Sequence, residues 1–513
     1  MLKSQEMRKL APEMDPLRIG TGWKKEDLEK PQIMVESTYG DSHPGSGHLN
    51  LLVEEVRKGV AEAGGFGARY FCTDICDGES QGTDGINYSL ASREMIANMI
   101  EIHANATPFD GGVYLSSCDK GMPGNLIGLA RVDIPAVVVP GGTMNAGPEM
   151  LTLEQLGMYS AKFERGEIDE EKLDWAKCNA CPSCGACSFI GTASTMQIMA
   201  EALGLALPGS ALMPATSPDL LAYAQEAGSQ AVKLAQMEHM RPSDLVTKES
   251  FENAILVHAA ISGSTNCLLH IPAIAHEFGI EITGDTFDRL HRNARYLLDV
   301  RPAGRWPAEC FYYAGGVPAI MEEIKDHLHL DVMTVTGKTL GENLAELREN
   351  GFYEKCSGWL AKFNERYGTS ITKEDIRINE AQAELLPLRY AAENNGYTVD
   401  WNGGDNTVTL KNGKHTVRIR INERLYDVDG KPATLKDAPL LIDDKTYVAD
   451  SFANDIFPDK YITKTDSGYS FADKTETSAD NMMKTVREIS WYPRSVDDAT
   501  HLDAMNYVTD KLT

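Results

Sequence analysis

The run Ile134-Pro-Ala-Val-Val-Val139 constrains the fold more than any other segment of this chain. It is short and apolar, and the turn-forming sequence Pro140-Gly-Gly142 ends it. Such a run is typical of a strand that is buried on both faces, as in a parallel sheet covered by helices. Because the chain up to about Asp375 is also rich in Gly, Ala, Met and Leu, we predict an alternating α/β architecture for this part.

The pattern changes to short alternating strands over residues 385–457. Thr407-Val-Thr-Leu410 and Thr416-Val-Arg-Ile-Arg-Ile421 flank Asn412-Gly413, a pair that favours a type I′ hairpin turn. We therefore expect a small β-rich module after the α/β domain. Further turns are predicted at Asp429-Gly430 and Asp443-Asp444.

Four segments follow from these patterns. They are an N-terminal tail at residues 1–21, an α/β domain at residues 22–375, a β-rich module at residues 385–458 and a helical tail at residues 459–513. In the last segment Ala504, Met505, Val508 and Leu512 have helical spacing, and the chain stops at Thr513 without a capping signal. We expect this final helix to be truncated.

Charge and hydropathy exclude several classes of partner. The 513 residues carry a net charge of -26, which disfavours binding to nucleic acids and to anionic membranes and leaves a small molecule as the expected substrate. The N-terminus has no apolar leader, and no run of apolar residues is long enough to span a membrane. We expect a cytoplasmic protein with reduced cysteines.

Four cysteines with a strict three-residue spacing, Cys178, Cys181, Cys184 and Cys187, indicate soft metal ligands rather than disulfides. A C-x2-C-x2-C run can hold a 4Fe-4S cluster, but this run leads into a predicted helix with Ser194 or Thr195 as N-cap and Gly204 as C-cap. A helix N-terminus stabilises a thiolate, so Cys187 is the candidate ligand. The alternative role for the other three is that of small buried hydrophobic residues.

Two further segments combine different donor types. The segment from Cys72 to Gly85 is a glycine-rich loop with clustered carboxylates, and Ser117-Cys-Asp-Lys120 places a thiol, a carboxylate and an amine together. Sulfur suits iron or zinc and carboxylate oxygen suits magnesium, so one site could hold both kinds of metal. Taken alone, an acidic glycine-rich loop is more often a solvated turn.

These motifs, in this order, resemble the dihydroxy-acid and sugar-acid dehydratase family. The matching segments are CDGESQGTDG, SCDKGMPGN, CPSCGACSFIGTASTM, EALGLALPGSALMPA, HAAISGSTNCLLHIPAIAHE, YAGGVPAIMEEI and DVMTVTGKTLGENL. The resemblance covers about Gly22 to Asp375 and implies a layered α/β dehydratase domain.

The resemblance implies a hydro-lyase that converts a 2,3-dihydroxy acid, such as a pentonate, to a 2-keto-3-deoxy acid with an iron-sulfur cluster and Mg²⁺. The cluster is expected to be 2Fe-2S, with 4Fe-4S as the alternative. A homo-oligomer assembled through the dehydratase domain is also implied. By resemblance the cluster ligands include Cys118 and Cys187, the magnesium residues are Asp77, Asp119 and Lys120, the catalytic residues are Asp119 and Lys120 (the lysine as a carbamate), and the substrate pocket is lined by Ser262, Ser264, Thr265 and Asn266.

The sequence departs from the family pattern at the first cluster cysteine. Most members carry it in a Pro-Cys-Asn segment, whereas the corresponding stretch here, residues 42–48, reads SHPGSGH. Cys76 is the expected substitute and Cys72 the fallback, and Cys76-Asp-Gly with Gln81-Gly-Thr resembles the xylonate dehydratase-like branch. For His258, His270 and His276 we expect packed or hydrogen-bonded roles, because none forms a helical i, i+4 metal pair.

The C-terminal part departs from the family. Family members continue into a β-barrel domain that supplies a further magnesium glutamate and the proposed serine base, and we find no matching segment here. Residues after Asp375 instead resemble the stalk module at the N-terminus of copper amine oxidase-like proteins, through LPLRYAAENNGYTVDW and KTYVADSFANDIF. Two alternative functions follow: a non-catalytic surface-binding fusion protein, and a branched-chain dihydroxy-acid dehydratase.

We predict that the 513-residue chain shows little dehydratase turnover, since loss of a positioned base typically costs about 10²–10⁴-fold in rate. An anaerobic assay of 2-keto acid formation on a panel of sugar acids checks this. Rates ordinary for a hydro-lyase would contradict it.

Overall fold

The computed structural model describes residues 2–377 except Asn293, and residues 385–473 except positions 414, 422, 424, 435–438, 443–444, 450–459 and 466–467. The chain divides into two compact units between residues 378 and 379. In the described ranges no helix is both long and apolar enough to cross a membrane.

A four-stranded parallel sheet organises the first unit, with strand order β2-β1-β3-β4. Strand β4 pairs with β3 from Gly112↔Ala136 to Ser116↔Pro140, and it is buried along its length. The α/β architecture predicted from residues 134–139 is therefore confirmed. The strands are β1 (Gln32–Ser37), β2 (Phe66–Phe71), β3 (Gly111–Ser116) and β4 (Ala136–Pro140).

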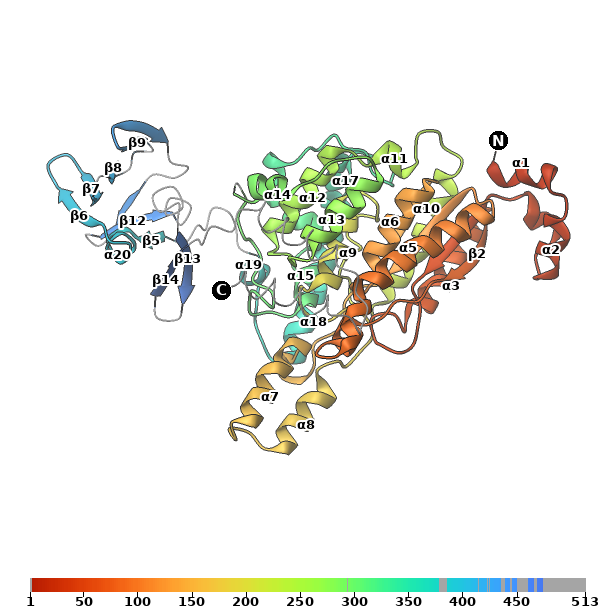
Figure 1. Ribbon diagram of the computed structural model, residues 1–513, viewed down its shortest axis with the longest axis horizontal. Coiled ribbons are helices and arrows are strands. Elements are labelled where there is room, and N and C mark those ends of the chain that lie inside the picture. Colours follow the sequence, from red (N-terminus) through yellow and green to blue (C-terminus); the bar gives the residue numbers. More distant parts are fainter. Residues whose placement is uncertain are drawn as a thin grey trace, which may run out of the picture. The chain divides into compact units, whose positions relative to one another are not determined.

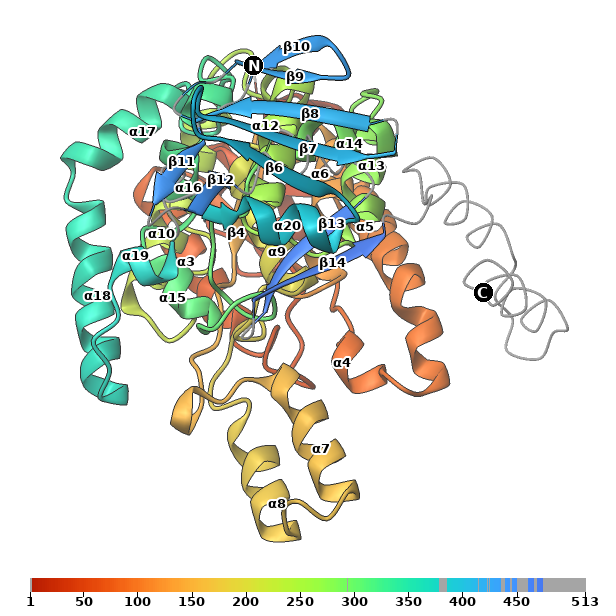
Figure 2. The ribbon, with the colours of Figure 1, turned by 90° about the vertical axis from the view of Figure 1, so that its left-hand side faces the viewer.

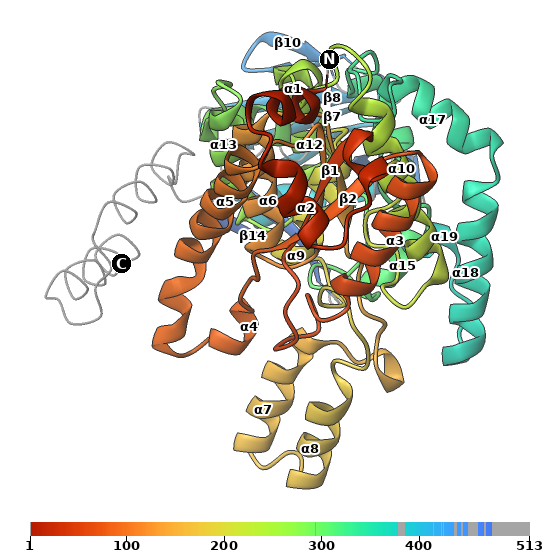
Figure 3. The same ribbon diagram turned by 90° about the vertical axis from the view of Figure 1, so that its right-hand side faces the viewer.

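Helices cover both faces of this sheet. Helices α3 (Leu49–Glu62) and α10 (Pro218–Leu234) pack on one face, and α5 (Ser89–Ala106) and α6 (Gly121–Val132) pack on the other (Figures 1 and 3). The strand order explains this division. The connection from β1 to β2 runs toward one edge of the sheet and the connection from β3 to β4 toward the other edge. Because both crossovers are right-handed, their helices lie on opposite faces. The sheet is thus doubly wound.

The remaining helices of the first unit surround this layered centre (Figure 1). They are α1 (Lys3–Leu10), α2 (Met14–Gly20), α4 (Asp77–Ser80), α7 (Leu156–Glu164), α8 (Glu170–Asn179), α9 (Thr192–Ala202), α11 (Pro242–Leu245), α12 (Lys248–Ala260), α13 (Cys267–Glu277), α14 (Gly284–His291), α15 (Ala308–Tyr313), α16 (Gly316–Glu323), α17 (Leu340–Glu349), α18 (Phe352–Tyr367) and α19 (Lys373–Ile376).

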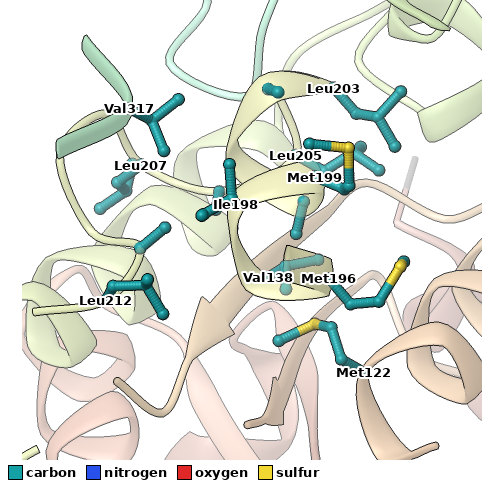
Figure 4. Packing of buried hydrophobic residues seen from close by; sticks show 14 of the residues in the cluster. Met122, Val138, Met196, Ile198, Met199, Leu203, Leu205, Leu207, Leu212 and Val317 are labelled. Carbon is teal, nitrogen blue, oxygen red and sulfur yellow. The ribbon is translucent and has the colours of Figure 1, made fainter. Parts of the chain in front are cut away.

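Helix α9 is buried at every residue. Figure 4 shows its Met196, Ile198 and Met199 among apolar side chains of β4, α6 and the segment after α9. The helix begins at Thr192 with Gly191 as N-cap, so the prediction of Ser194 or Thr195 as N-cap is wrong. Their hydroxyls instead donate to carbonyls of the preceding turn. The predicted glycine stop is confirmed, because Gly204 follows with φ 76°.

Helices α3 and α10 approach each other through glycine. A Cβ added at Gly59 would lie 1.8 Å from the Gln225 carbonyl oxygen, and one at Gly228 would lie 2.1 Å from that of Val56. Only residues without a side chain allow the two backbones to come this close.

Helix α1 anchors the N-terminal segment to the sheet. Ser4 is fully buried, and its backbone N–H and hydroxyl donate to the Asp110 carboxylate at 2.8 and 2.6 Å. The same carboxylate accepts from the Gln32 backbone N–H, which ties helix α1 to strand β1. Local sequence patterns do not predict this anchor, because Ser4 and Asp110 are more than one hundred residues apart.

The second unit is antiparallel. Its largest sheet has the order β10-β9-β8-β7-β6, and helix α20 packs against it through Leu388, Ala391 and Ala392 (Figure 2). The elements are β5 (Leu385–Pro387), α20 (Leu388–Asn394), β6 (Thr398–Asn402), β7 (Thr407–Asn412), β8 (His415–Arg420), β9 (Leu425–Val428), β10 (Lys431–Thr434), β11 (Leu440–Ile442), β12 (Lys445–Ala449), β13 (Lys460–Thr465) and β14 (Gly468–Asp473).

The structure confirms the predicted turn at Asn412-Gly413, where β7 and β8 pair at Asn412↔His415, and the turn at Asp429-Gly430. The turn at Asp443-Asp444 lies outside the described residues. The helical tail predicted from residue 459 is wrong for residues 460–473, where β13 and β14 pair from Lys460↔Asp473 to Thr465↔Gly468. Their alternating side chains suit a hairpin better than a helix. The helix expected around residues 504–512 lies outside the described residues.

We predict that Gly228→Ala lowers the free energy of unfolding by roughly 2 kcal/mol or more, because the new methyl group must push α10 away from the Val56 carbonyl. Gly358→Ala in α18 is the matched control, since a Cβ there meets no atom within 4 Å. It should raise stability by about 0.5–1 kcal/mol. Chemical denaturation of the two variants measures both effects, and equal stabilities would contradict the packing argument.

Candidate metal-binding site

The chemically active side chains follow the carboxyl ends of the parallel strands. The loop after β1 carries His43, the loop after β2 carries Cys76 and Asp77, and the turn after β3 carries Cys118 to Lys120. Chain connections leave β1 and β3 in opposite directions, and doubly wound sheets bind ligands at the carboxyl edge of such a position. The fold therefore gathers donors from three loops that are far apart in the sequence.

Two cysteines form the soft part of the site. The thiols of Cys76 and Cys118 lie in hydrogen-bonding contact. This contact, aided by the backbone N–H groups of Gly78 and Glu79, lowers the pKa of Cys76 to about 6. The same contact, together with burial, raises the pKa of Cys118 well above its ordinary value. For the fallback residue, Cys72, burial raises the pKa of the thiol to about 11.

The loop from Cys178 to Cys187 borders the same region. Burial raises the pKa of Cys187, and the charges of Asp119, Cys181 and Cys76 raise it further. These three groups therefore lie near Cys187. Cys178 and Cys181 are exposed and Cys184 is partly exposed, so the interpretation of these three as buried hydrophobic residues is wrong. The run begins in the last turn of α8 and continues through a surface loop toward α9, where small side chains remain in contact with solvent.

An ion pair forms the hard part of the site. Lys120 Nζ donates to Asp77 Oδ2 at 2.6 Å, and the Lys120 side chain is only 4% exposed. Ser89 Oγ donates to the same oxygen at 2.8 Å. The other oxygen, Asp77 Oδ1, is buried and has no hydrogen-bond partner. An unpartnered buried carboxylate oxygen is costly, and it is also the donor that a hard cation requires.

Asp119 links this ion pair to a turn from another part of the unit. Burial raises its pKa, the charge of Lys120 opposes that shift, and the Thr192 hydroxyl donates to its carboxylate. Thr192 Oγ1 lies 2.9 Å from Ser264 Oγ and accepts from Asn266 Nδ2 at 2.7 Å. Ser264 and Asn266 thus connect to Asp119 through one threonine, whereas Ser262 and Thr265 lie exposed on the same turn.

Two of the three histidines with expected packing roles are hydrogen-bonded as predicted. His258 Nε2 lies 3.0 Å from the Ser264 carbonyl oxygen, and its ring stacks on His291. His270 Nδ1 lies 3.1 Å from Arg93 NH1, and burial lowers the pKa of this imidazole. His276 is exposed near the end of α13.

Sequence reasoning missed one group, formed by His43, Ser46 and Asp74. His43 Nε2 lies 3.0 Å from Asp74 Oδ1, and the Ser46 hydroxyl donates to the same oxygen. Ligand atoms of His43, Asp74 and Cys118 all lie within 4.8 Å of one another. The available signal was that His43 lies in residues 42–48, the stretch that corresponds to the family segment with the first cluster cysteine.

The donors present fit two kinds of metal group. Cys76, Cys118 and Cys187 supply soft sulfur, and Asp77 and Asp119 supply hard oxygen. The fold and these side chains define an α/β domain with a candidate site of mixed sulfur and oxygen donors at the carboxyl edge of its sheet.

Comparison with known proteins identifies the family. The family model described as dihydroxy-acid/6-phosphogluconate dehydratase N-terminal matches residues 30–343, which is more than half of the chain. The chain therefore belongs to this dehydratase family and contains its N-terminal domain. A second model, described as copper amine oxidase N-terminal domain, matches residues 372–464, in agreement with the expected module.

Curated relatives include a dihydroxy-acid dehydratase of Halothermothrix orenii, 40% identical over 72% of this chain and 69% of the relative. The dihydroxy-acid dehydratase of Solidesulfovibrio magneticus is 42% identical over 64% of this chain and 59% of its own length. Dihydroxy-acid dehydratase 1 of Methanosarcina acetivorans is 42% identical over 64% of this chain and 60% of its own length. The chain thus spans about three fifths to two thirds of the length of these relatives.

We predict that Cys76 reacts with iodoacetamide as a thiolate in the metal-free chain, with a reaction rate that rises through a pKa of about 6. Cys118→Ala should move this midpoint upward toward the ordinary thiol value near 8.5, because it removes the hydrogen bond that stabilises the thiolate. Mass spectrometry of labelled peptides measures the profile. An unchanged midpoint in the variant would show that Cys118 does not act on Cys76.

Proposed function

We propose that the first unit is the metal-binding domain of a hydro-lyase that dehydrates a 2,3-dihydroxy acid to a 2-keto-3-deoxy acid. The observation that carries this proposal is the adjacency of two donor sets on one turn. Cys118 contacts the thiol of Cys76, and Lys120, two residues further on, pairs with Asp77 beside Cys76. Two Lewis acids side by side would assist loss of a hydroxyl group and of a neighbouring proton from one substrate.

Each donor set has a proposed occupant. Cys76, Cys118 and Cys187 would hold an iron-sulfur cluster, either 2Fe-2S or 4Fe-4S, while Asp77, Asp119 and Lys120 would hold Mg²⁺. When bound, these groups supply Lewis acids for the departing hydroxyl and for the carboxylate side of the substrate. Each of two loops carries donors for both groups: Cys76 precedes Asp77 in one, and Cys118 precedes Asp119 in the other. The protein would therefore fix the two groups relative to each other.

Lys120 and Asp119 have proposed roles that depend on protonation. A carbamate forms only on a neutral amine, so Lys120 must give up the proton that it shares with Asp77. Asp119 must be ionised to bind a cation, and burial raises its pKa. Cation binding therefore releases protons, and the affinity for Mg²⁺ should increase with pH.

A sugar acid is the proposed substrate. The turn beside Asp119 offers the Ser264 hydroxyl and the Asn266 amide, which suit a molecule with several hydroxyl groups. The segment around Cys76 and Asp77, which resembles the xylonate-type branch, supports the same choice. A branched-chain dihydroxy acid is the second candidate, and the names of the curated relatives support it.

The test is anaerobic loading of the chain with Fe²⁺, sulfide and Mg²⁺, followed by addition of pentonates, hexonates and branched-chain dihydroxy acids. Visible absorption reports the cluster, and its change on addition of an acid reports binding even where turnover is slow. A spectral response to sugar acids supports the proposal. A chain that stays colourless favours the non-catalytic alternative, and a response to branched-chain acids alone favours the second candidate.

We predict that Asp119→Asn weakens binding of Mn²⁺, used as a probe for Mg²⁺, by at least about 10–100-fold while the iron content stays unchanged. The physical reason is loss of one charged oxygen ligand without loss of a side chain from the core. Glu149→Gln, at a side chain that is 70% exposed, is the control. Titration followed by the EPR signal of free Mn²⁺ measures the affinity, and equal affinities for variant and parent would remove Asp119 from the site.

A further inference from the structure

We infer that His43 binds, through Nδ1, the same metal group as Cys118. This inference rests on the proposed metal site but assigns a nitrogen ligand that the motifs of the family do not include. It begins from burial: His43 is 4% exposed, and its Nδ1 has no hydrogen-bond partner and almost no solvent contact. A buried ring nitrogen without a partner is unfavourable unless a ligand satisfies it.

The other face of the ring is already fixed. Nε2 lies 3.0 Å from Asp74 Oδ1, and Asp74 is itself held by the Ser46 hydroxyl. Histidines that bind metals usually donate the second ring N–H to a carboxylate, which sets the tautomer and the direction of the free nitrogen. With Nε2–H bonded to Asp74, the lone pair of His43 is on Nδ1.

His43 Nδ1 and the thiol of Cys118 both face the space beside Gly45 that a side chain there would occupy. A Cβ built at Gly45 would be 3.0 Å from His43 Nδ1 and 3.1 Å from Cys118 Sγ, so one point next to Gly45 is close to both donors. Metal bonds to nitrogen and sulfur are about 2.0 and 2.3 Å long, so two ligands of one ion lie at most about 4.3 Å apart. A ring nitrogen of His43, a carboxylate oxygen of Asp74 and the thiol sulfur of Cys118 all lie within 4.8 Å of one another, which is close to this limit.

Glycine at position 45 keeps this space open. Any side chain there would enter the gap between the imidazole and the thiol. Because no positive φ is recorded for Gly45, alanine should adopt the same backbone conformation. The effect of Gly45→Ala on metal binding would therefore be steric.

A histidine ligand changes the electronic properties of the group. Neutral imidazole carries one negative charge fewer than a thiolate, and replacing cysteine by histidine raises the reduction potential of an iron-sulfur cluster. Conversely, His43→Cys should keep the metal and lower the potential.

The test uses the full chain, reconstituted anaerobically with Fe²⁺ and sulfide and then reduced. Pulsed EPR should show coupling to a ¹⁴N nucleus in the parent, and His43→Ala should lose this coupling. His43→Cys should bind iron with a lower reduction potential, whereas Gly45→Ala should bind less iron. His48→Gln is the matched control, because His48 is also buried in this loop with an unpartnered Nδ1, but its Nε2 lies 2.7 Å from the Gly141 carbonyl oxygen and it does not belong to the group of His43, Asp74 and Cys118.

Loading with Co²⁺ alone separates this inference from the proposed function. If no iron-sulfur cluster forms, the proposed function fails, while a cobalt-thiolate absorption that His43→Ala weakens at least about 10-fold in affinity still supports the histidine ligand. A parent without ¹⁴N coupling, a coupling that persists in His43→Ala, or a chain that binds neither probe would overturn the inference.

Discussion

The buried amide of Gln197 holds the carboxyl edge of the sheet in place. Its Nε2 donates to the carbonyl oxygens of Ser117 and Gly142, and its Oε1 accepts from the Gly142 backbone N–H. These bonds join α9 to the turns after β3 and β4, and a buried polar group left unpaired there would cost about 1–3 kcal/mol. Because Ser117 precedes Cys118 and α9 follows the Cys187 loop, one side chain sets the relative position of both cysteines.

The charge distribution explains how the proposed metal site can be stable in the metal-free chain. Burial and the carboxylates of Asp77 and Asp74 raise the pKa of Asp119, while the ammonium group of Lys120 opposes that shift and pairs with Asp77. Lys120 thus occupies, in electrostatic terms, the place of a cation. A divalent ion that binds here must replace this interaction, so its affinity depends on the state of the lysine as much as on the number of carboxylates.

Local patterns predicted local structure well. The apolar run before Pro140 gave the buried strand β4, and Asn412-Gly413 gave the hairpin turn, because each depends on neighbouring residues. The order of the motifs also indicated Cys76 as a candidate cluster ligand, and the structure places its thiol near that of Cys118. The pair of His43 and Asp74 was missed because it joins loops after different strands, which only the sheet order brings together.

The hairpin of α7 and α8 has a small apolar cluster of its own, made by Leu151, Ala176 and Ala180 and flanked by Tyr159 and Trp175 (Figures 2 and 3). So small a core gives a low free energy of local opening compared with that of the whole unit. Cys178 lies in the last turn of α8, while Cys187 precedes the fully buried α9. We therefore expect the cysteine loop to join a segment with fast amide hydrogen exchange to one with slow exchange, with the exposed thiols of Cys178 and Cys181 on the side of the fast segment.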